Sequence, residues 1–481
     1  MASPWVEVGD QVLRSDVEIL AAYGLIAPML TTWPIPWAQV SHQLLPKLFI
    51  PRDPLGNQLP DAVASLPPHV WRSLDRVRAR LAEETAINRF RESSVIRVTN
   101  EPALVRGFGT SARDEIDARF RVEYMGRSTA ARLAVGNQGE AGFDNGKIAL
   151  DDSYFAQGVG NWLLYGGVVD HWWGPGWVSS LILSNNARPF PRVGIMRNNP
   201  KAFEALWLSW IGPWQLNAFV GVLDEDGRVV SNPIVLGFRL TANPLAGLEL
   251  GASRTIMICG RDRPCTLKTL GQVLIGQGRE SGDDFANEVA SLDALFASSL
   301  DGQHFTLYGQ LGFEDEARLR PSFIGGLFGL SLWGGIRDDG ALWRLTAEYS
   351  DSTAGFYKGD PDFDAFYNHT LYRSGYRYRE RSIGHSLDGD SRLFSLVATL
   401  TDIHDWTYSL AYHHAELNRD GGGRQLVSTS AEDVNLAEAA LIIPWRRGTF
   451  EVELRAQDDQ PNTPGEIDFQ ASVEASWTIR F

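Results

Sequence analysis

The final residues of the chain alternate strictly between apolar and polar side chains. From Phe469 to Phe481, in FQASVEASWTIRF, every odd position is apolar and every even position is polar. A period of two is typical of a β-strand with one apolar and one polar face. In a soluble sandwich the apolar face meets a core, whereas in a membrane barrel it meets lipid. This strand alone leaves both architectures open.

The same alternation recurs along the chain from about residue 94 onward, in segments that begin at Phe120, Phe305, Ala341, Trp406 and Phe450. Their polar faces carry charges in mid-strand, which a dry core would reject and a water-filled lumen would accept. Aromatic residues gather near the segment ends, as in the interface girdles of membrane barrels. We therefore predict an all-β fold, a large transmembrane antiparallel β-barrel of about 18 strands, over residues 94–481.

The connections predicted between these strands are of two kinds. Short clusters such as RDDG at 337–340 and RRG at 446–448 predict tight turns, whereas longer polar stretches cover roughly 260–300 and 351–391. Short turns at one end and long loops at the other are the layout of an outer-membrane barrel. We expect the terminal strand to close this barrel with its odd residues facing lipid. Its final Phe481 resembles the signal read by the barrel-assembly machinery.

Residues 1–93 follow a helical pattern instead. Ser15 lies three residues before Glu18, a capping-box spacing that predicts a helix start. Pro36 is placed for the first turn of a second helix. The clearest helix has apolar positions at Val70, Leu74, Val77 and Leu81. An arginine-rich row on its other face predicts a solvated surface, with contact to anionic lipid or polymer as the alternative.

Composition narrows the class of protein. The chain has 44 basic and 59 acidic residues, a net charge of −15, which argues against nucleic-acid binding. It contains no run of eighteen apolar residues, so no transmembrane helix is predicted. The chain opens with MASPW, and we expect Met1 to replace a removed signal peptide, with a protein that truly starts there as the alternative.

The two cysteines, Cys259 and Cys265, lie in CGRDRPC. Their six-residue separation, with Gly and Pro between them, allows a small disulfide loop suited to an oxidising compartment. Two free thiols are the alternative. Two cysteines alone make a poor zinc site, and no metal or cofactor is expected.

Several long segments carry a family resemblance. They are the opening ASPWVEVGDQVLRSDVEILAAYGLI, residues 160–193 (GNWLLYGGVVDHWWGPGWVSSLILSNNARPFPRV), residues 367–392 and the GASRT…CG…RPC segment around 251–265. Over nearly the whole chain these resemble the Wzi-type capsule assembly proteins of the Gram-negative outer membrane. The resemblance implies a barrel with a periplasmic helical bundle at residues 1–93. It also implies a lectin-like role, holding capsular polysaccharide at the cell surface.

Sugar binding uses flat aromatic faces together with planar polar groups. Two segments concentrate both, and their candidate residues are Trp172, Trp173, Trp177, Asn185, Asn186 and Arg188 in the first, and Tyr372, Arg373, Tyr376, Arg377, Tyr378, Asp388 and Asp390 in the second. Guanidinium groups of the second segment suit the carboxylates of an acidic polymer. The alternative for each segment is a structural one, a plug folded into the lumen.

Catalytic motifs are missing from the sequence. It contains no G-x-S-x-G, no H-E-x-x-H and no phosphate-binding glycine loop, so we expect no enzyme. The main alternative to a polysaccharide-binding barrel is a porin or channel for sugars or other solutes, whose charged strand faces would line an open pore. A hydrolase of lipid or glycan is the third class.

Overall fold

The computed structural model describes residues 4–48, 66–138, 148–224, 227–274, 286–300, 303–314, 323–336, 339–422, 424–463 and 468–481. Met1, the first half of the predicted turn at 337–340 and residues 275–285 of the predicted long loop lie outside the described residues. Within the described part of the chain, no helix is both long enough and apolar enough to cross a membrane.

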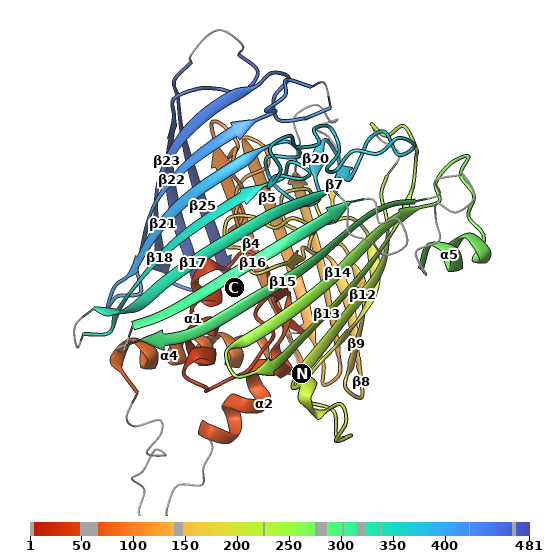
Figure 1. Cartoon of the computed structure of the whole chain (residues 1–481). Helices are drawn as coiled ribbons and strands as arrows, with labels where there is room; N and C mark the ends of the chain where they lie inside the picture. Colours follow the sequence, from red (N-terminus) through yellow and green to blue (C-terminus); the bar gives the residue numbers. More distant parts are fainter. Residues whose placement is uncertain are drawn as a thin grey trace, which may run out of the picture.

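Antiparallel strands close into one barrel (Figure 1), which confirms the predicted fold class. The closed barrel contains nineteen strands among the described residues. β7 and β8 pair with successive parts of the same neighbouring strand, β6, and so together occupy one strand position in an 18-strand barrel. The strands are β4 (Arg89–Thr99), β5 (Ile116–Met125), β6 (Thr129–Gln138), β7 (Ile148–Ala149), β8 (Tyr154–Val159), β9 (Trp162–Gly167), β11 (Arg192–Arg197), β12 (Trp214–Val222), β13 (Ile234–Leu245), β14 (Leu248–Ile258), β15 (Ala286–Leu300), β16 (Gln303–Glu314), β17 (Ile324–Ile336), β18 (Ala341–Asp351), β21 (Arg392–Thr401), β22 (Thr407–Leu417), β23 (Glu432–Trp445), β24 (Gly448–Gln457) and β25 (Gln470–Arg480).

The barrel closes between its first and last strands. β25 pairs with β4 from Glu474 opposite Thr99 to Arg480 opposite Ser93, which confirms the terminal strand as the closing one. β4 begins at Arg89, ahead of the boundary at residue 94 that the pattern predicts.

The two faces of each strand have opposite surroundings. On β24, Leu454 points outward and is 56% exposed, whereas its neighbour Arg455 points inward and is 4% exposed. The apolar faces therefore form a lipid-facing belt, and the charged faces line an enclosed interior. At one end of the belt, several aromatic side chains are exposed or half-exposed, and we call them the aromatic girdle: Phe90, Trp214, Trp406, Trp445 and Phe481.

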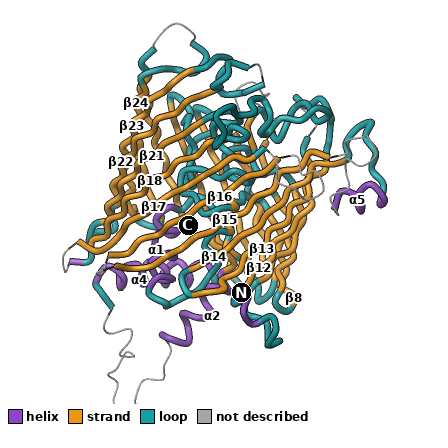
Figure 2. The backbone as a smooth tube through the Cα atoms, viewed as in Figure 1, coloured by secondary structure: helices purple, strands orange, loops and turns teal. Residues whose placement is uncertain are grey.

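The barrel has a short-turn end and a long-loop end. At the short-turn end, residues 246–247 join β13 to β14 and residues 446–447 join β23 to β24. At the other end, residues 168–191 and 352–391 fold back inside the ring of strands, where Figure 2 shows loops within the barrel. These two segments are named the first and second plug loops. They contain the short strands β10 (Trp172–Trp173), β19 (Arg377–Tyr378) and β20 (Arg381–Ser382).

One predicted loop is in fact partly a strand. The polar stretch at 260–300 contains β15, and only its first part, with the short helix α5 (Leu267–Leu274), is a connection. β15 reads as polar because its inward face carries Asp293, which is fully buried against Arg239 of β13 at 2.8 Å. The prediction of a continuous loop was therefore wrong, since a paired charge inside a lumen looks like a surface charge in sequence.

The N-terminal region contributes helices α1 (Gln11–Ala22), α2 (Trp37–Leu48) and α4 (Pro68–Glu84), and the two-residue strands β1 (Trp5–Val6), β2 (Thr32–Trp33) and β3 (Ile35–Pro36). Val70, Leu74, Val77 and Leu81 are buried as predicted. α4 packs on α1 and lies at the short-turn end against β17 and β18 (Figure 1). Its arginine row is not simply solvated, because Arg76 bridges Asp16 at 2.6 Å and Asp405 at 2.7 Å.

The start of α1 differs from the predicted capping box. The helix begins at Gln11, and the carboxylate of Asp10 caps it by accepting the Leu13 N–H at 2.9 Å. Ser15 and Glu18 lie inside the helix and face the barrel wall instead. The hydroxyl oxygen of Ser15 accepts from Arg344 of β18, whose guanidinium also pairs with Glu18 at 2.9 Å. Ser15 and Glu18, which would form a local capping box, are instead paired with Arg344 of the barrel wall.

The carboxylate of Glu18 is buried between the guanidinium groups of Arg344 and Arg14, the latter at 3.2 Å. Glu18→Ala leaves two buried guanidinium groups without this partner, and we expect a loss of about 3 kcal/mol of folding free energy. The measurement is the temperature at which the folded band of the detergent-solubilised protein disappears on an SDS gel.

The matched control is Asp75→Ala on α4, which removes an exposed ion pair with Arg78. An exposed pair contributes little to stability, so this variant should unfold at the temperature of the unaltered protein. Equal unfolding temperatures for Glu18→Ala and Asp75→Ala would contradict the structural role of the buried pair.

Candidate functional site

The first plug loop is fixed to the barrel wall by one carboxylate. Glu348 of β18 accepts the backbone N–H groups of Trp177, Val178 and Ser179 at 2.7, 3.2 and 2.6 Å. It also accepts the hydroxyl of Tyr308 at 2.8 Å. These hydrogen bonds satisfy the buried carboxylate of Glu348 and, at the same time, the buried backbone N–H groups of this turn.

The tryptophans of this loop are packed within the lumen. Trp172 and Trp173 are fully buried, and β10, which they form, pairs with β2 of the N-terminal region. Trp177 is half-buried between two guanidinium groups, with Arg14 at 4.2 Å and Arg344 at 4.7 Å from its ring. A side chain at Gly176 would collide with the carbonyl oxygen of Ser179, which explains the glycine in WWGPGW.

The polar candidates of the first plug loop are also engaged inside the protein. The Asn185 side chain donates to the carbonyl oxygens of Phe108 and Gly109, and the Asn186 side chain donates to that of Ser382. Arg188 pairs with Asp151 at 2.9 Å. These contacts fit the structural alternative. Sugar binding by the first segment stays a prediction.

The second plug loop brings most of its candidate residues together in the interior. Tyr372, Tyr376 and Tyr378 are buried in one apolar cluster with Trp173. The Tyr376 hydroxyl donates to the carbonyl oxygen of Ile182 in the first plug loop at 2.8 Å. The two plug loops therefore pack on each other.

The charged candidates of the second plug loop divide by exposure. Arg377 donates from Nε to both carboxylate oxygens of Asp388, at 3.0 and 2.9 Å, and both side chains are buried. Asp390 accepts the Asp364 N–H at 2.8 Å, and burial raises its pKa to about 7. Only Arg373 among the thirteen candidates is exposed to solvent.

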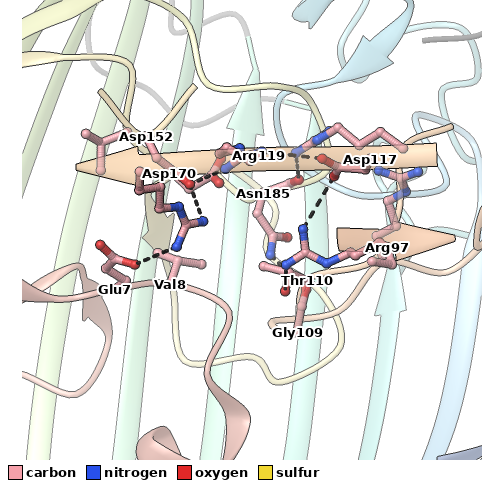
Figure 3. A pocket seen from close by; sticks show the side chains of 15 residues that line it. Glu7, Val8, Arg97, Gly109, Thr110, Asp117, Arg119, Asp152, Asp170 and Asn185 are labelled. Carbon is pink, nitrogen blue, oxygen red and sulfur yellow. Dashed lines mark hydrogen bonds and ion pairs between the residues drawn. The ribbon is translucent and has the colours of Figure 1, made fainter. Parts of the chain in front are cut away.

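A small cavity lies between the plug and the wall (Figure 3). It has a volume of about 60 Å³ and is lined by charged groups that include Arg97, Asp117, Arg119 and Asp170. Arg97 reaches Asp117 at 3.4 Å, and burial raises the pKa of Asp170 to about 7. A space of this size has room for a few water molecules.

A cluster of arginines lies on the outside of the plug at the long-loop end. We call it the rim arginine cluster, and it consists of Arg228, Arg261, Arg263, Arg373 and Arg379. Arg261 and Arg373 are exposed, and the other three are half-buried. The guanidinium of Arg379 pairs with Asp224 at 2.7 Å. Burial lowers the pKa of Arg228 to about 10. Because this value is still well above neutral pH, the guanidinium stays charged there.

Three connections converge to build this cluster. The disulfide between Cys259 and Cys265, whose Cα atoms are 4.9 Å apart, closes the loop that carries Arg261 and Arg263. That loop is held to the second plug loop, because the Tyr372 hydroxyl donates to the carbonyl oxygen of Cys259 at 3.0 Å. Arg263 approaches the carbonyl oxygen of Leu371 at 3.5 Å.

The third connection, described at residues 223–224 and 227–233, docks on the same surface. The Arg228 guanidinium donates to the carbonyl oxygens of Arg377 and Gly375, and the Val229 N–H donates to the hydroxyl of Ser374 at 2.9 Å. The backbone N–H of Arg261 donates to the carbonyl oxygen of Ser231 at 2.9 Å. The five arginines thus belong to three connections that are hydrogen-bonded to one another.

Sequence reasoning found Arg373 and placed Arg379 in the same arginine-rich segment, but it missed Arg228, Arg261 and Arg263 as candidates. The signal for two of them was the R-x-R spacing inside CGRDRPC, which a disulfide displays on a tight loop. No local pattern places Arg228 beside them. Elsewhere in the described chain, no three His, Cys, Asp or Glu side chains are grouped to hold a metal ion.

Comparison with known proteins agrees with this architecture. The structure of Wzi from Escherichia coli, described as a carbohydrate-binding outer-membrane β-barrel involved in group 1 capsule assembly, superposes with a TM-score of 0.82 at 22% identity, covering 99% of each chain. An uncharacterized 55.8 kDa protein in the cps region of Klebsiella pneumoniae is 28% identical over 346 residues. That match covers 71% of this chain and only 64% of the relative's length.

The family model of the capsule assembly protein Wzi matches residues 87–464, which span the barrel from just before β4 to the connection before β25. This match covers well over half of the sequence. The chain is therefore a member of the Wzi capsule assembly protein family.

Proposed function

We propose that this protein lies in the outer membrane of a Gram-negative cell and binds acidic capsular polysaccharide at its long-loop end, holding the capsule to the surface. Membership of the Wzi family supports a role in capsule assembly. The lipid-facing belt supports the membrane position. The proposal includes no covalent chemistry on the polymer.

The rim arginine cluster is the observation that carries this proposal. The protein as a whole has a net charge of −15, yet five arginines converge on one outer surface. Guanidinium groups bind carboxylates in a planar, two-pronged geometry, and uronic acids are the sugars that supply carboxylates. Because the plug loops are packed beneath the cluster, a polymer would lie across this surface and not pass through the barrel.

The proposed orientation places the long-loop end outside the cell, as is usual for outer-membrane barrels. The short-turn end and helices α1, α2 and α4 then face the periplasm, so these helices act as an inner closure of the barrel. Recognition of β25 and Phe481 by the barrel-assembly machinery stays a prediction.

The paired variant Arg261→Ala with Arg373→Ala tests the polysaccharide site. Both side chains are exposed, so the barrel should keep its heat resistance on SDS gels. Each lost guanidinium should cost about 1 kcal/mol of binding, so the pair should weaken binding roughly 30-fold. Gel retardation of purified acidic capsular polysaccharide measures the effect.

Arg424→Ala is the matched control, because Arg424 is an exposed arginine at the same end that pairs with Asp364 outside the cluster. It should bind the polymer as tightly as the unaltered protein. A neutral polysaccharide should bind weakly to all three proteins. Equal retardation by the double variant and the control would place the site elsewhere.

The filled lumen predicts little or no ion current through the unaltered protein in planar bilayers. Glu348→Ala should raise the frequency of openings, since it removes the acceptor of three backbone N–H groups that hold the first plug loop. Glu416→Ala, at the half-exposed long-loop rim, is the control and should stay silent. A steady large conductance from the unaltered protein would favour the channel function instead.

A further inference from the structure

One connection at the short-turn end is much longer than its neighbours. Residues 198–213 join β11 to β12, whereas β13 and β14 are joined by residues 246–247 alone. The connection includes a single 3-10 turn, η1 (Ser209–Ile211). We call residues 198–213 the β11–β12 excursion.

The excursion is held firmly at its base. Phe203 stacks on Trp214, the first residue of β12, with ring centroids 4.7 Å apart. The Arg197 guanidinium covers the Trp214 ring at 3.8 Å and donates to the carbonyl oxygen of Lys201 at 2.7 Å. The backbone N–H of Asn199 donates to the side chain of Asn161 at 2.9 Å. These contacts fix the base of the excursion against the start of β12.

Its tip nevertheless presents large apolar side chains to the surroundings. Leu206 is 90% exposed, Trp207 is 76% exposed and Trp210 is 69% exposed. Three such side chains within five positions are unusual on a water-facing surface, because each would gain free energy from leaving water. Something apolar is expected to cover them.

The position of the excursion identifies that covering. Trp214, on which its base stacks, points outward and belongs to the aromatic girdle. The backbone N–H of Asn243 donates to the carbonyl oxygen of Pro213, and two residues beyond it Leu245 is 67% exposed on the same outer side. The exposed tip is thus attached at the short-turn edge of the lipid-facing belt, the edge at which membrane barrels meet the headgroups.

We propose that the β11–β12 excursion inserts Leu206, Trp207 and Trp210 into the interfacial zone of the phospholipid leaflet at the short-turn end. Tryptophan is the side chain that favours this zone, since its ring is apolar and its indole N–H stays near water. An apolar surface that lies on a leaflet gains affinity from the buried area. The excursion then anchors one side of the barrel to the inner leaflet.

A single thiol placed at the tip tests this inference. Cys259 and Cys265 are joined in a disulfide, so Leu206→Cys adds one reactive thiol, which takes an environment-sensitive nitrobenzoxadiazole dye. In phospholipid nanodiscs we expect blue-shifted emission and strong quenching by lipids that carry a spin label near the headgroup. Deep spin labels and aqueous iodide should quench several-fold less.

Asp75→Cys on α4 is the control, since Asp75 is an exposed position at the same end on a helix that covers the barrel mouth. Its dye should be quenched by iodide and not by the spin-labelled lipids. Iodide quenching at 206 equal to that at 75 would overturn the proposal.

Protection of position 206 from both iodide and spin-labelled lipid would also overturn it, and would assign the tip to a second copy of the chain or another protein. Both variants must show the heat-resistant folded band before labelling. This inference rests on the membrane position and not on the polysaccharide site. Failure of one therefore leaves the other standing, because polymer retardation is measured separately.

Discussion

The charges on the inner barrel wall pair with backbone and side-chain groups of the plug loops and the N-terminal region, and the rest of the structure depends on this pairing. Glu348 receives three backbone N–H groups of the first plug loop. Glu249 receives the N–H groups of Leu30 and Thr31 at 2.7 and 3.0 Å. Arg239 contacts both Asp293 and the hydroxyl oxygens of Thr31 and Thr32. Charges removed from water need such partners, since an unpaired one costs several kcal/mol.

This constraint explains why the lumen is filled by parts of the same chain. The inner barrel wall carries carboxylates or guanidinium groups on β13 to β16 and on β18, and the N-terminal region and plug loops meet them with backbone amides and complementary side chains. The tryptophans of WWGPGW then occupy the space between these polar anchors. Arg261 and Arg373, by contrast, remain exposed at the rim, where the proposed polysaccharide site lies.

Much of the fold could be predicted from the period-two pattern, because lipid selects an apolar outer face on every strand. The helix at Pro68–Glu84 was equally readable from Val70, Leu74, Val77 and Leu81. β15 was missed, since Asp293 gives its inner face a loop-like polarity, and α1 was misplaced because Ser15 and Glu18 serve Arg344. In both cases the decisive partner lies far away in the sequence.

The candidate site was less accessible to sequence reasoning than the fold. Aromatic and charged residues in the two plug loops suit sugar binding in composition, but composition does not distinguish an inward side chain from an outward one. Arg377 and Arg373 are four positions apart, yet one is buried on Asp388 and the other is exposed. The rim arginine cluster is assembled from three connections, which only the closed barrel brings together.

The seam between β4 and β25 joins residues near 93–99 to residues near 474–480, so the barrel wall is completed only when both ends of this long sheet are present. A substitution that weakens a buried ion pair in the interior should therefore impair folding and assembly of the barrel, and less of the protein would be found in the envelope. A substitution on the rim leaves abundance intact. Under the proposed function, variants that fail to hold capsule can thus be sorted by protein quantity alone, before any ligand is tested.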